Sequence, residues 1–505
     1  MTTVLDMKRP LISRIPRLFA FSVIIFISLS NIDLALKKPF WVDEGYEIVV
    51  SCAMAPSAMF RDGMAPQCSP NPLYYWVQKV VVESLFLGRF DVEILWKYRV
   101  LSLISAAFFL ALIYLFFSRA FNELVGLVAL FGISSAAIFH NYSAENRPYS
   151  LWLLLFVTTL ISAFRISRPG TPDGRSRTRN RILVIVSALA LVLVSGAGGV
   201  QGLAILFGIF IIRPKEIHWL FPSAVLIAVV AWYYGRHSCI STDAGQYDLL
   251  VTRNWELLRS VAELFWLSPF HLLGLSSDTL VLIGLFFPFS KRGLTAAGMV
   301  DEKTRTWLRT IHIHLWLQLG ASVALGGLVA YRHYFFVERI FIFLIVLKAI
   351  AMALGAAIAW RAILQFKIAA RLRSVSTELV LAGAVAAFCL ISAHNRKGAI
   401  LYNVPKPIVF ENVSSTPCLS LPANWRGYIS KAATPDIWLN SIVAFSQLVR
   451  SCASAGNQTV LGDRAVVFKP TGGTSQTSAT FEFVETAPDD SFKPISQCGK
   501  TFPIR

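Results

Sequence analysis

The chain has 505 residues, of which 55% are hydrophobic and 15% are charged, and its mean hydropathy is +0.58. Soluble domains carry about 25% charged residues, so this composition excludes a soluble globular protein. The formal charge of +18 does not indicate a nucleic-acid-binding protein, because the basic residues gather in short segments between apolar runs. We therefore expect the lipid bilayer, and no nucleic acid, as the partner of this chain.

Two regions differ in composition. Apolar runs recur between residues 18 and 393, whereas residues 394–505 are polar and contain no run long enough to span a bilayer. The predicted fold class is therefore an α-helical polytopic membrane domain over residues 1–393, followed by a small soluble α/β domain over residues 394–505. In that second domain, alternating patterns predict strands at 459–468 and 478–485, and a helical pattern covers 437–452.

Eleven apolar segments are candidates for membrane spans. Basic residues favour the cytoplasmic side, and residues 165–181 hold six arginines against one aspartate. This orientation predicts a multi-pass protein of the cell inner (plasma) membrane with a cytoplasmic N-terminus, an outer first loop at 37–99 and an outer C-terminal domain. The predicted spans are 18–36, 100–117, 123–139, 149–164, 182–195, 199–212, 219–233, 270–289, 311–329, 340–360 and 378–393.

The weakest part of this topology is the stretch 182–212. Residues 195–199, with the sequence S-G-A-G-G, must turn the chain between two short helices. A single long helix there would instead place the C-terminal domain in the cytoplasm. The first span follows four basic residues, as a signal peptide does, but no small-residue cleavage site follows it, so we expect an uncleaved anchor.

We expect a catalytic site on the outer side of the membrane, because the long loops lie there and the inner loops are short and basic. Helical patterns in 41–50, 72–87 and 255–266 predict helices lying along the membrane interface. Six of the seven cysteines fall outside, where Cys52 could pair with Cys68 and two tail cysteines could pair, or all could remain free thiols. Cys389 lies in the last span.

Three polar clusters fall at the same outer boundary. Ionisable groups cost about 2.5–3.5 kcal/mol each at the bilayer centre, so at its edge they normally pair or line a wet cavity. One alternative is that they are loop charges that anchor helix ends. The clusters are Asp43 and Glu44 in W-V-D-E-G-Y, then Glu145, Arg147 and Tyr149 in H-N-Y-S-A-E-N-R-P-Y, and Arg332, His333 and Arg339 in Y-R-H-Y-F-F-V-E-R.

The order of these motifs resembles a known family. The acidic pair of the first loop is followed by P-N-P-L-Y-Y-W at 70–76, E-N-R-P-Y at 145–149 and R-H-Y-F-F-V at 332–337. This series is similar to the GT-C class of integral-membrane glycosyltransferases, over roughly residues 18–360. The nearest branch is the bacterial one with aminoarabinose, galacturonosyl and protein O-mannosyl transferases.

The resemblance implies an inverting glycosyltransferase. Its donor would be a polyprenyl-phosphate-linked sugar, and its acceptor a glycan, lipid or protein on the outer face of the membrane. Asp43 takes the position of the general base, and Glu145 that of a second acid near the reaction centre. Arginines suit the departing phosphate because a guanidinium holds two of its oxygens. The implied substrate-binding residues are Glu44, Tyr74, Lys79, Arg147, Tyr149, Arg332, His333 and Arg339.

The metal requirement stays open. Glu145 could orient the acceptor or share a divalent cation, Mg²⁺ or Mn²⁺, with Asp43, and we predict no metal site. The chain also departs from many relatives before the proline pair of the first loop. Ser69 and Asn71 stand where relatives have His or Lys, so Lys79 is the candidate to supply a basic contact.

Two other functions compete with transfer. A transporter or flippase of a lipid-linked sugar would need charges near the bilayer midplane, and Lys348 is the clearest such residue in a predicted span. A structural scaffold would leave the clustered Asp43, Glu145 and Arg332 without a role. Neither the sugar nor the acceptor follows from the sequence.

Overall fold

The structure is a computed structural model. It describes residues 15–38, 44, 47, 51, 56–62, 71–86, 97–168, 174–237, 261, 272–289, 302–331, 338–365 and 375–402, and short strands between 410 and 503. Contacts divide the chain into two units, which we describe separately. Unit 1 holds residues 1–31, 102–143 and 148–397, and unit 2 holds 32–101, 144–147 and 398–505. The predicted helix at 437–452, the predicted helix at 255–266 except residue 261, and the cysteines other than Cys389 and Cys418 lie outside what the structure describes.

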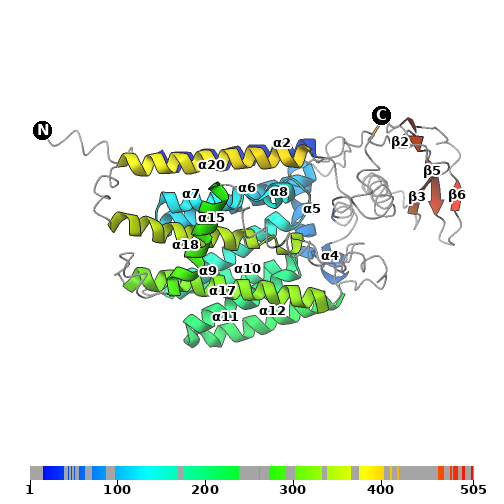
Figure 1. The fold of residues 1–505 in the computed structure, drawn as a ribbon. Helices are drawn as coiled ribbons and strands as arrows, with labels where there is room; N and C mark the ends of the chain where they lie inside the picture. Colours follow the sequence, from blue (N-terminus) through cyan, green and yellow to red (C-terminus); the bar gives the residue numbers. More distant parts are fainter. Residues whose placement is uncertain are drawn as a thin grey trace. The chain divides into compact units, whose positions relative to one another are not determined.

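Unit 1 is built from helices (Figure 1). Each predicted span coincides with at least one helix, although the bounds differ by several residues at many ends. The elements are α2 (Ile15–Lys37), α6 (Val100–Ala120), α7 (Glu123–Ser134), α8 (Ala137–Ser143), α9 (Tyr149–Ser167), α10 (Gly174–Val194), α11 (Ala197–Ile212), η2 (Pro214–Glu216), α12 (Ile217–His237), α15 (Leu272–Phe286), η3 (Phe287–Phe289), α17 (Glu302–Tyr331), η4 (Glu338–Phe341), α18 (Leu344–Gln365) and α20 (Val375–Tyr402).

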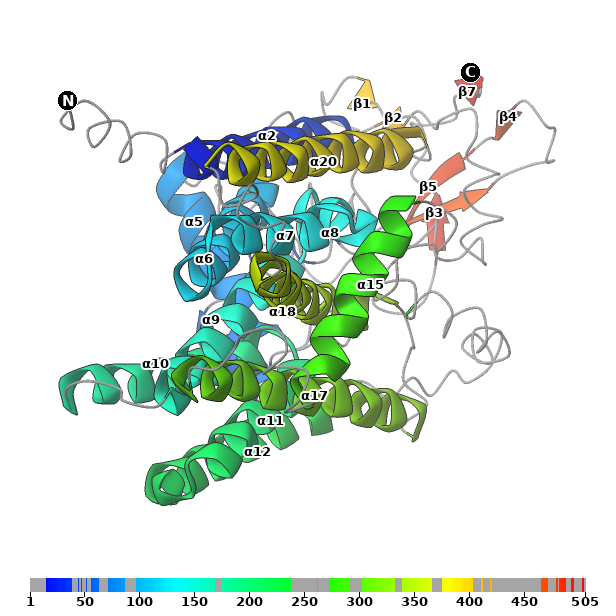
Figure 2. The same ribbon diagram turned by 60° about the vertical axis from the view of Figure 1, so that its left-hand side comes forward.

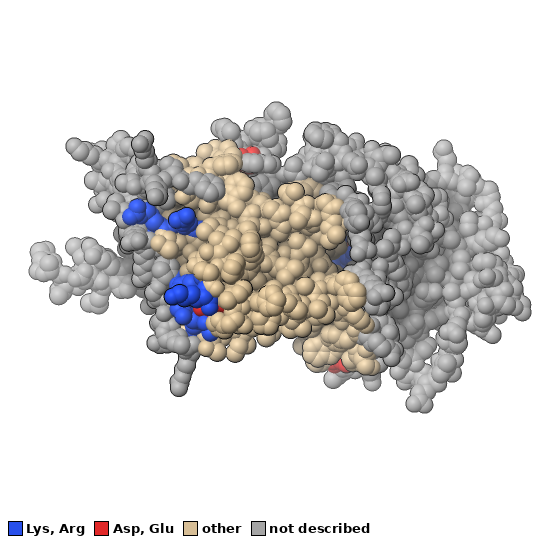
Figure 3. Space-filling model, turned by 90° about the horizontal axis from the view of Figure 1, so that it is seen from below, with Lys and Arg blue, Asp and Glu red and all other residues tan. Residues whose placement is uncertain are grey.

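Seven of the described helices are long and apolar enough to cross a membrane, or eight if α7 and α8 form one broken span. α11 and the 276–286 part of α15 are apolar but shorter. Large apolar side chains are exposed on α12, α17 and α20, including Phe221 (65%), Val323 (77%) and Val380 (69%). Figure 3 shows a broad surface without charged side chains, which suits contact with lipid rather than with water. The chain is therefore a nearly all-helical membrane protein.

The stretch 182–212 forms two helices, as the two-span interpretation predicts. α10 ends at Val194, α11 begins at Ala197, and the two helices pack against each other. Gly198 makes this tight return feasible, because a Cβ atom at that position would collide with the carbonyl group of Leu191. The single long helix is thus excluded.

The predicted span at 123–139 is broken. α7 and α8 meet at an angle of 75°. At the break the hydroxyls of Ser134 and Ser135 donate to the carbonyls of Phe131 and Gly132, a bonding pattern that bends helices. The buried His140 then contacts the Ser134 carbonyl (2.9 Å) and the side-chain amide of Asn31 in α2 (2.8 Å). Periodicity along residues 123–139 does not indicate this break, because both pieces are apolar.

Of the seven candidate spans, α18 is the most buried, and it packs against α7, α15 and α17. Figure 2 shows α15 crossing it. Their contact depends on two glycines, since a Cβ atom at Gly284 would meet the backbone of Ala351, and one at Gly355 would meet the backbone of Leu280. Close backbone approach through small residues is how helices associate in membranes.

Unit 2 contains the end of α2, the loop helices α4 (Pro56–Asp62) and α5 (Pro72–Phe86), and the strands of the tail. α5 confirms the predicted helix at 72–87. In the tail, β3 (Ala465–Pro470), β5 (Phe481–Thr486) and β6 (Phe492–Pro494) form an antiparallel sheet in the order β3-β5-β6. Two further antiparallel pairings join β1 (Phe410–Glu411) with β2 (Cys418–Leu419) and β4 (Ser478–Ala479) with β7 (Phe502–Pro503). Both predicted strands overlap this sheet, and the helical half of the predicted α/β domain stays a prediction.

The close crossing of α15 and α18 leads to a test. Gly284→Ala should lower the stability of the purified protein by about 1–3 kcal/mol, because the added methyl group overpacks a backbone contact. The matched control is Gly320→Ala in α17, where no atom lies within 4 Å of the new Cβ. That variant should melt at the wild-type temperature or above it. Equal melting temperatures for both variants would contradict the packing described here.

Candidate functional site

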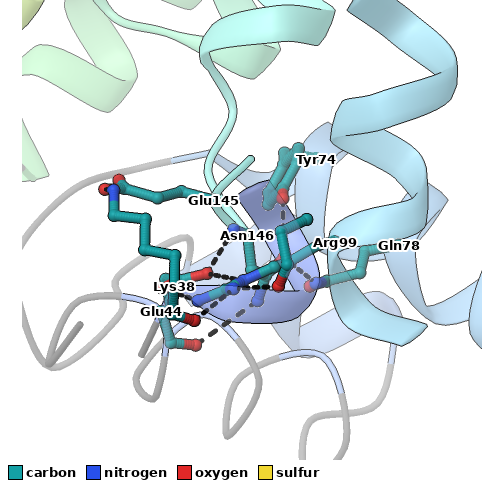
Figure 4. A network of polar contacts seen from close by, with 8 residues as sticks. Lys38, Glu44, Tyr74, Gln78, Arg99, Glu145 and Asn146 are labelled. Carbon is teal, nitrogen blue, oxygen red and sulfur yellow. Dashed lines mark hydrogen bonds and ion pairs between the residues drawn. The ribbon is translucent and has the colours of Figure 1, made fainter. Parts of the chain in front are cut away.

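The candidate site is a network of buried polar side chains in unit 2 (Figure 4). Its centre is Arg99, the residue before the first turn of α6, whose side chain is fully buried together with that of Glu44. Arg99 Nε donates to Glu44 Oε1 and Nη2 donates to Glu44 Oε2, both at 2.8 Å. Two parallel charge-assisted bonds of this kind fix both position and orientation.

The same guanidinium also closes the end of α2. Arg99 Nη1 donates to the carbonyls of Ala35 (2.5 Å) and Lys38 (2.7 Å). The last carbonyls of a helix have no partner within the helix and carry its negative dipole end, so a cation there is favourable. Arg99 therefore holds the C-terminal end of α2 and Glu44 of the first loop in one place.

Glu44 extends the network to the turn at 144–147. Its Oε1 accepts a bond from the backbone N–H of Asn146 (2.6 Å), while the Asn146 amide donates to the Glu44 carbonyl (3.3 Å). Asn146 Oδ1 accepts from the hydroxyl of Tyr74 (2.7 Å) and from the amide of Gln78, both on α5. Gln78 also donates to the carbonyl of Tyr98 (3.3 Å). Four chain segments, namely the first loop, α5, the start of α6 and the turn at 144–147, thus share one set of hydrogen bonds.

A second ion pair joins Lys38 and Glu145. Figure 4 shows the two side chains reaching toward each other at the edge of the network. The side chains of Lys38 and Glu145 are 11% and 7% exposed, whereas those of Arg99 and Glu44 are fully buried. Because the pair of Lys38 and Glu145 is more exposed, a ligand can reach it with less movement of the surrounding side chains than it would need to reach Arg99 and Glu44.

Arg147 lies beside a carboxylate that the sequence did not single out. Its Nη1 is 3.3 Å from Glu47 Oε1, and both side chains are almost fully buried. The Tyr75 hydroxyl also hydrogen-bonds with Glu47 and Asn71. Burial and the nearby Glu47 carboxylate hold the pKa of Tyr75 well above its usual value, so Tyr75 stays neutral and can donate. The structure thus places a carboxylate beside Arg147, which the family resemblance implies as a substrate-binding residue.

The other expected site residues are distributed as follows. Glu44, Tyr74, Glu145 and Arg147 belong to the network, and Lys79 on α5 pairs with Glu83 at 3.7 Å. Tyr149 begins α9 in unit 1, where its ring lies 4.6 Å from that of Tyr142, and Arg339 lies in η4 of the same unit. Asp43, Arg332 and His333 lie outside the described residues.

Sequence reasoning did not single out Lys38, Glu47, Gln78, Arg99 and Asn146 as site residues. Lys38 and Arg99 lie at the ends of apolar segments, where basic residues are normally taken as membrane anchors. One signal was present, because Arg99 and Lys97 fall on the side of the membrane that the topology makes poor in basic residues. Within the described part of the chain, no three His, Cys, Asp or Glu side chains are grouped so that they could hold a metal ion.

Comparisons with known proteins give matches among solved structures only. No family model and no curated protein matches the chain. ArnT from Cupriavidus metallidurans is similar at 13% identity in the apo state, with 76% of each chain covered and a TM-score of 0.41. The same protein bound to undecaprenyl phosphate is 14% identical, covers 75% of this chain and 77% of that one, and has a TM-score of 0.40.

An archaeal structure matches as well. It is the oligosaccharyltransferase AglB from Archaeoglobus fulgidus, in complex with an inhibitory peptide and a dolichol-phosphate. The identity is 13% and the TM-score 0.41, and the match covers 84% of this chain but 59% of AglB. Both proteins are glycosyltransferases of the GT-C class, which is the class that the sequence motifs resemble. Likeness at this level assigns no role to any residue.

The buried pair of Arg99 and Glu44 can be tested by neutralisation. Glu44→Gln should lower stability by about 3–5 kcal/mol, because it leaves the Arg99 charge buried without its counter-ion. The matched control is Glu83→Gln on α5, whose side chain is 56% exposed and whose loss should cost less than about 1 kcal/mol. Thermal unfolding of the purified variants measures both. Equal losses in the two variants would show that the network does not hold this unit together.

Proposed function

We propose that the chain is an inverting glycosyltransferase that moves a sugar from a polyprenyl-phosphate donor to an acceptor on the outer face of the membrane. One observation gives this proposal its strongest support. The buried network joins Glu44, from the acidic pair of the first loop, to Asn146, in the E-N-R-P-Y motif. Those are two of the motifs whose order resembles the GT-C class, and they are 102 residues apart in the chain.

The roles of the acids follow from the chemistry of inversion. The acceptor hydroxyl needs one carboxylate that removes its proton on the face opposite the leaving group. Asp43 is proposed for this role because it is adjacent in sequence to Glu44, whose two oxygens are engaged by Arg99 and Asn146. Glu145 is proposed to orient the acceptor, and its ion pair with Lys38 holds its side chain in place.

The leaving phosphate needs fixed cations. Preorganised positive groups stabilise a departing negative charge more than mobile water does. In unit 2, Lys38 and Arg147 each already neutralise a carboxylate, Glu145 and Glu47 respectively. A phosphate that binds there must share these cations, and the more exposed Lys38 is the better candidate. Arg332, His333, Arg339 and Tyr149 remain proposed phosphate or sugar contacts from the motif resemblance. We propose no metal or other cofactor.

The proposed topology has eleven spans, a cytoplasmic N-terminus and an outer C-terminal domain, in the inner (plasma) membrane. It is supported by the helices found at every predicted span and by the two separate helices α10 and α11. Its orientation is supported by the arginine-rich stretch between α9 and α10. The site motifs then fall on the outer side, where the polyprenyl-phosphate-linked sugar and a glycan, lipid or protein acceptor would meet.

The transporter alternative has one observation in its favour. Lys348 of α18 is 1% exposed within a membrane-spanning helix, and the charge of Asp278 in α15 acts on it. Ionisable groups inside spans often mark transport pathways. A single variant distinguishes the two functions. If the protein is a transferase, Lys348→Met should leave sugar transfer intact, whereas if it is a flippase, the same substitution should abolish translocation of the lipid-linked sugar.

The catalytic proposal is tested at Asp43. Asp43→Asn should reduce sugar transfer by about 10²- to 10⁴-fold, the usual contribution of a positioned general base. The protein should still insert in the membrane and melt near the wild-type temperature. Transfer is followed as release of free polyprenyl phosphate from a panel of polyprenyl-phosphate hexoses and pentoses. Glu83→Gln is the control for an acid-to-amide change in the same unit, and a variant Asp43→Asn with wild-type turnover would refute the assignment.

A further inference from the structure

A cluster of three arginines lies at helix ends in unit 1 and includes none of the motif residues discussed above. Arg119 is in the last turn of α6, Arg165 is in the last turn of α9, and Arg179 is in the first turns of α10. All three residues are exposed.

The helix ends that carry Arg119 and Arg165 are held together by aromatic rings, and α10, which carries Arg179, packs against α9. Phe116 of α6 stacks on Phe164 of α9, with ring centroids 5.5 Å apart. Trp307 of α17 contacts both rings, at 6.1 and 6.3 Å. Arg165 directly follows Phe164 in the chain, and Arg119 comes three residues after Phe116. The position of the cluster is thus fixed by packing rather than by loop conformation.

The cluster concentrates positive charge. Arg119 and Arg179 are close enough to Arg165 for their charges to act on it. Within the described residues, no carboxylate pairs with any of the three. Neighbouring basic residues differ in this respect, since Arg177 and Arg181 share Glu216, and Arg17 is bonded to Glu123. Three like charges held together favour a bound counter-anion.

The depth of the cluster in the membrane indicates which class of anion it binds. α6 and α9 are long and apolar enough to cross a membrane, and Arg119 and Arg165 stand at their ends. The ends of spanning helices lie at the level of lipid headgroups, where phosphate groups are concentrated. A guanidinium binds phosphate oxygens through two parallel hydrogen bonds, and basic pockets between spanning helices bind anionic headgroups.

We propose that Arg119, Arg165 and Arg179 form a binding site for the phosphate of an anionic phospholipid, distinct from the candidate transfer site in unit 2. The lipid would bridge the ends of α6, α9 and α10 and neutralise their mutual repulsion. The protein should therefore be more stable with an anionic lipid than with a zwitterionic one. This inference does not depend on the proposed transferase activity.

The test uses the full-length protein purified in a neutral detergent. Its melting temperature is measured during titration with phosphatidylglycerol, phosphatidylcholine or inorganic phosphate. Phosphatidylglycerol should raise the melting temperature of the wild type, while the other two should not. In R119Q/R179Q the apparent affinity for phosphatidylglycerol should fall about 10- to 30-fold, because each basic side chain at a membrane surface contributes about fivefold.

The matched control is K215Q/R361Q. It removes two exposed basic side chains, one on η2 and one on α18, that no described carboxylate pairs with. This variant should keep the wild-type response, which separates a site from a general effect of net charge. Arg179→Gln alone should lower the affinity about fivefold and replaces the double variant if that one does not fold. Equal losses in both double variants, an unchanged R119Q/R179Q, or an equal response to inorganic phosphate would overturn the proposal.

Discussion

A fully buried ion pair between Arg99 and Glu44 organises the described part of unit 2. Transferring two charges from water to the protein interior costs desolvation free energy. Such a pair is tolerated only when its remaining hydrogen-bonding groups also have partners. Here they are, because Arg99 also caps α2 and Glu44 also accepts the Asn146 N–H. The pair therefore fixes where the first loop, the turn at 144–147 and α5 meet. The positions proposed for the reacting acids depend on that meeting point.

Much of the fold was predictable because apolar composition alone indicates where the long helices lie. Each apolar run predicted as a span coincides with a helix, and the glycine-rich turn at 195–199 correctly separated α10 from α11. The break between α7 and α8 was not predictable, because it arises from serine hydroxyls and the tertiary contacts of His140 with Asn31 and Ser134. Periodicity along the chain contains no information on such contacts.

The site was predictable only in part, for a similar reason. The motifs located Glu44, Glu145 and Arg147, whereas their partners Arg99, Lys38 and Glu47 have no distinctive sequence context. An ion pair between residues 55 positions apart is a property of the folded chain. The consequence for function is that Glu44 has a positioning role in this structure, and Lys38 becomes a candidate phosphate contact that the motifs did not indicate.

The identity of the bound lipid tests the central claim most directly. The protein can be isolated from its native membrane in mild detergent, and its co-purified lipids identified by mass spectrometry. We expect a polyprenyl phosphate, with or without a sugar, bound in about equimolar amount to the wild type and depleted in the variant Lys38→Gln. The same lipid in a Lys348→Met preparation would agree with a transferase. Diacyl phospholipids alone, from a preparation that still transfers sugar, would contradict the proposed donor.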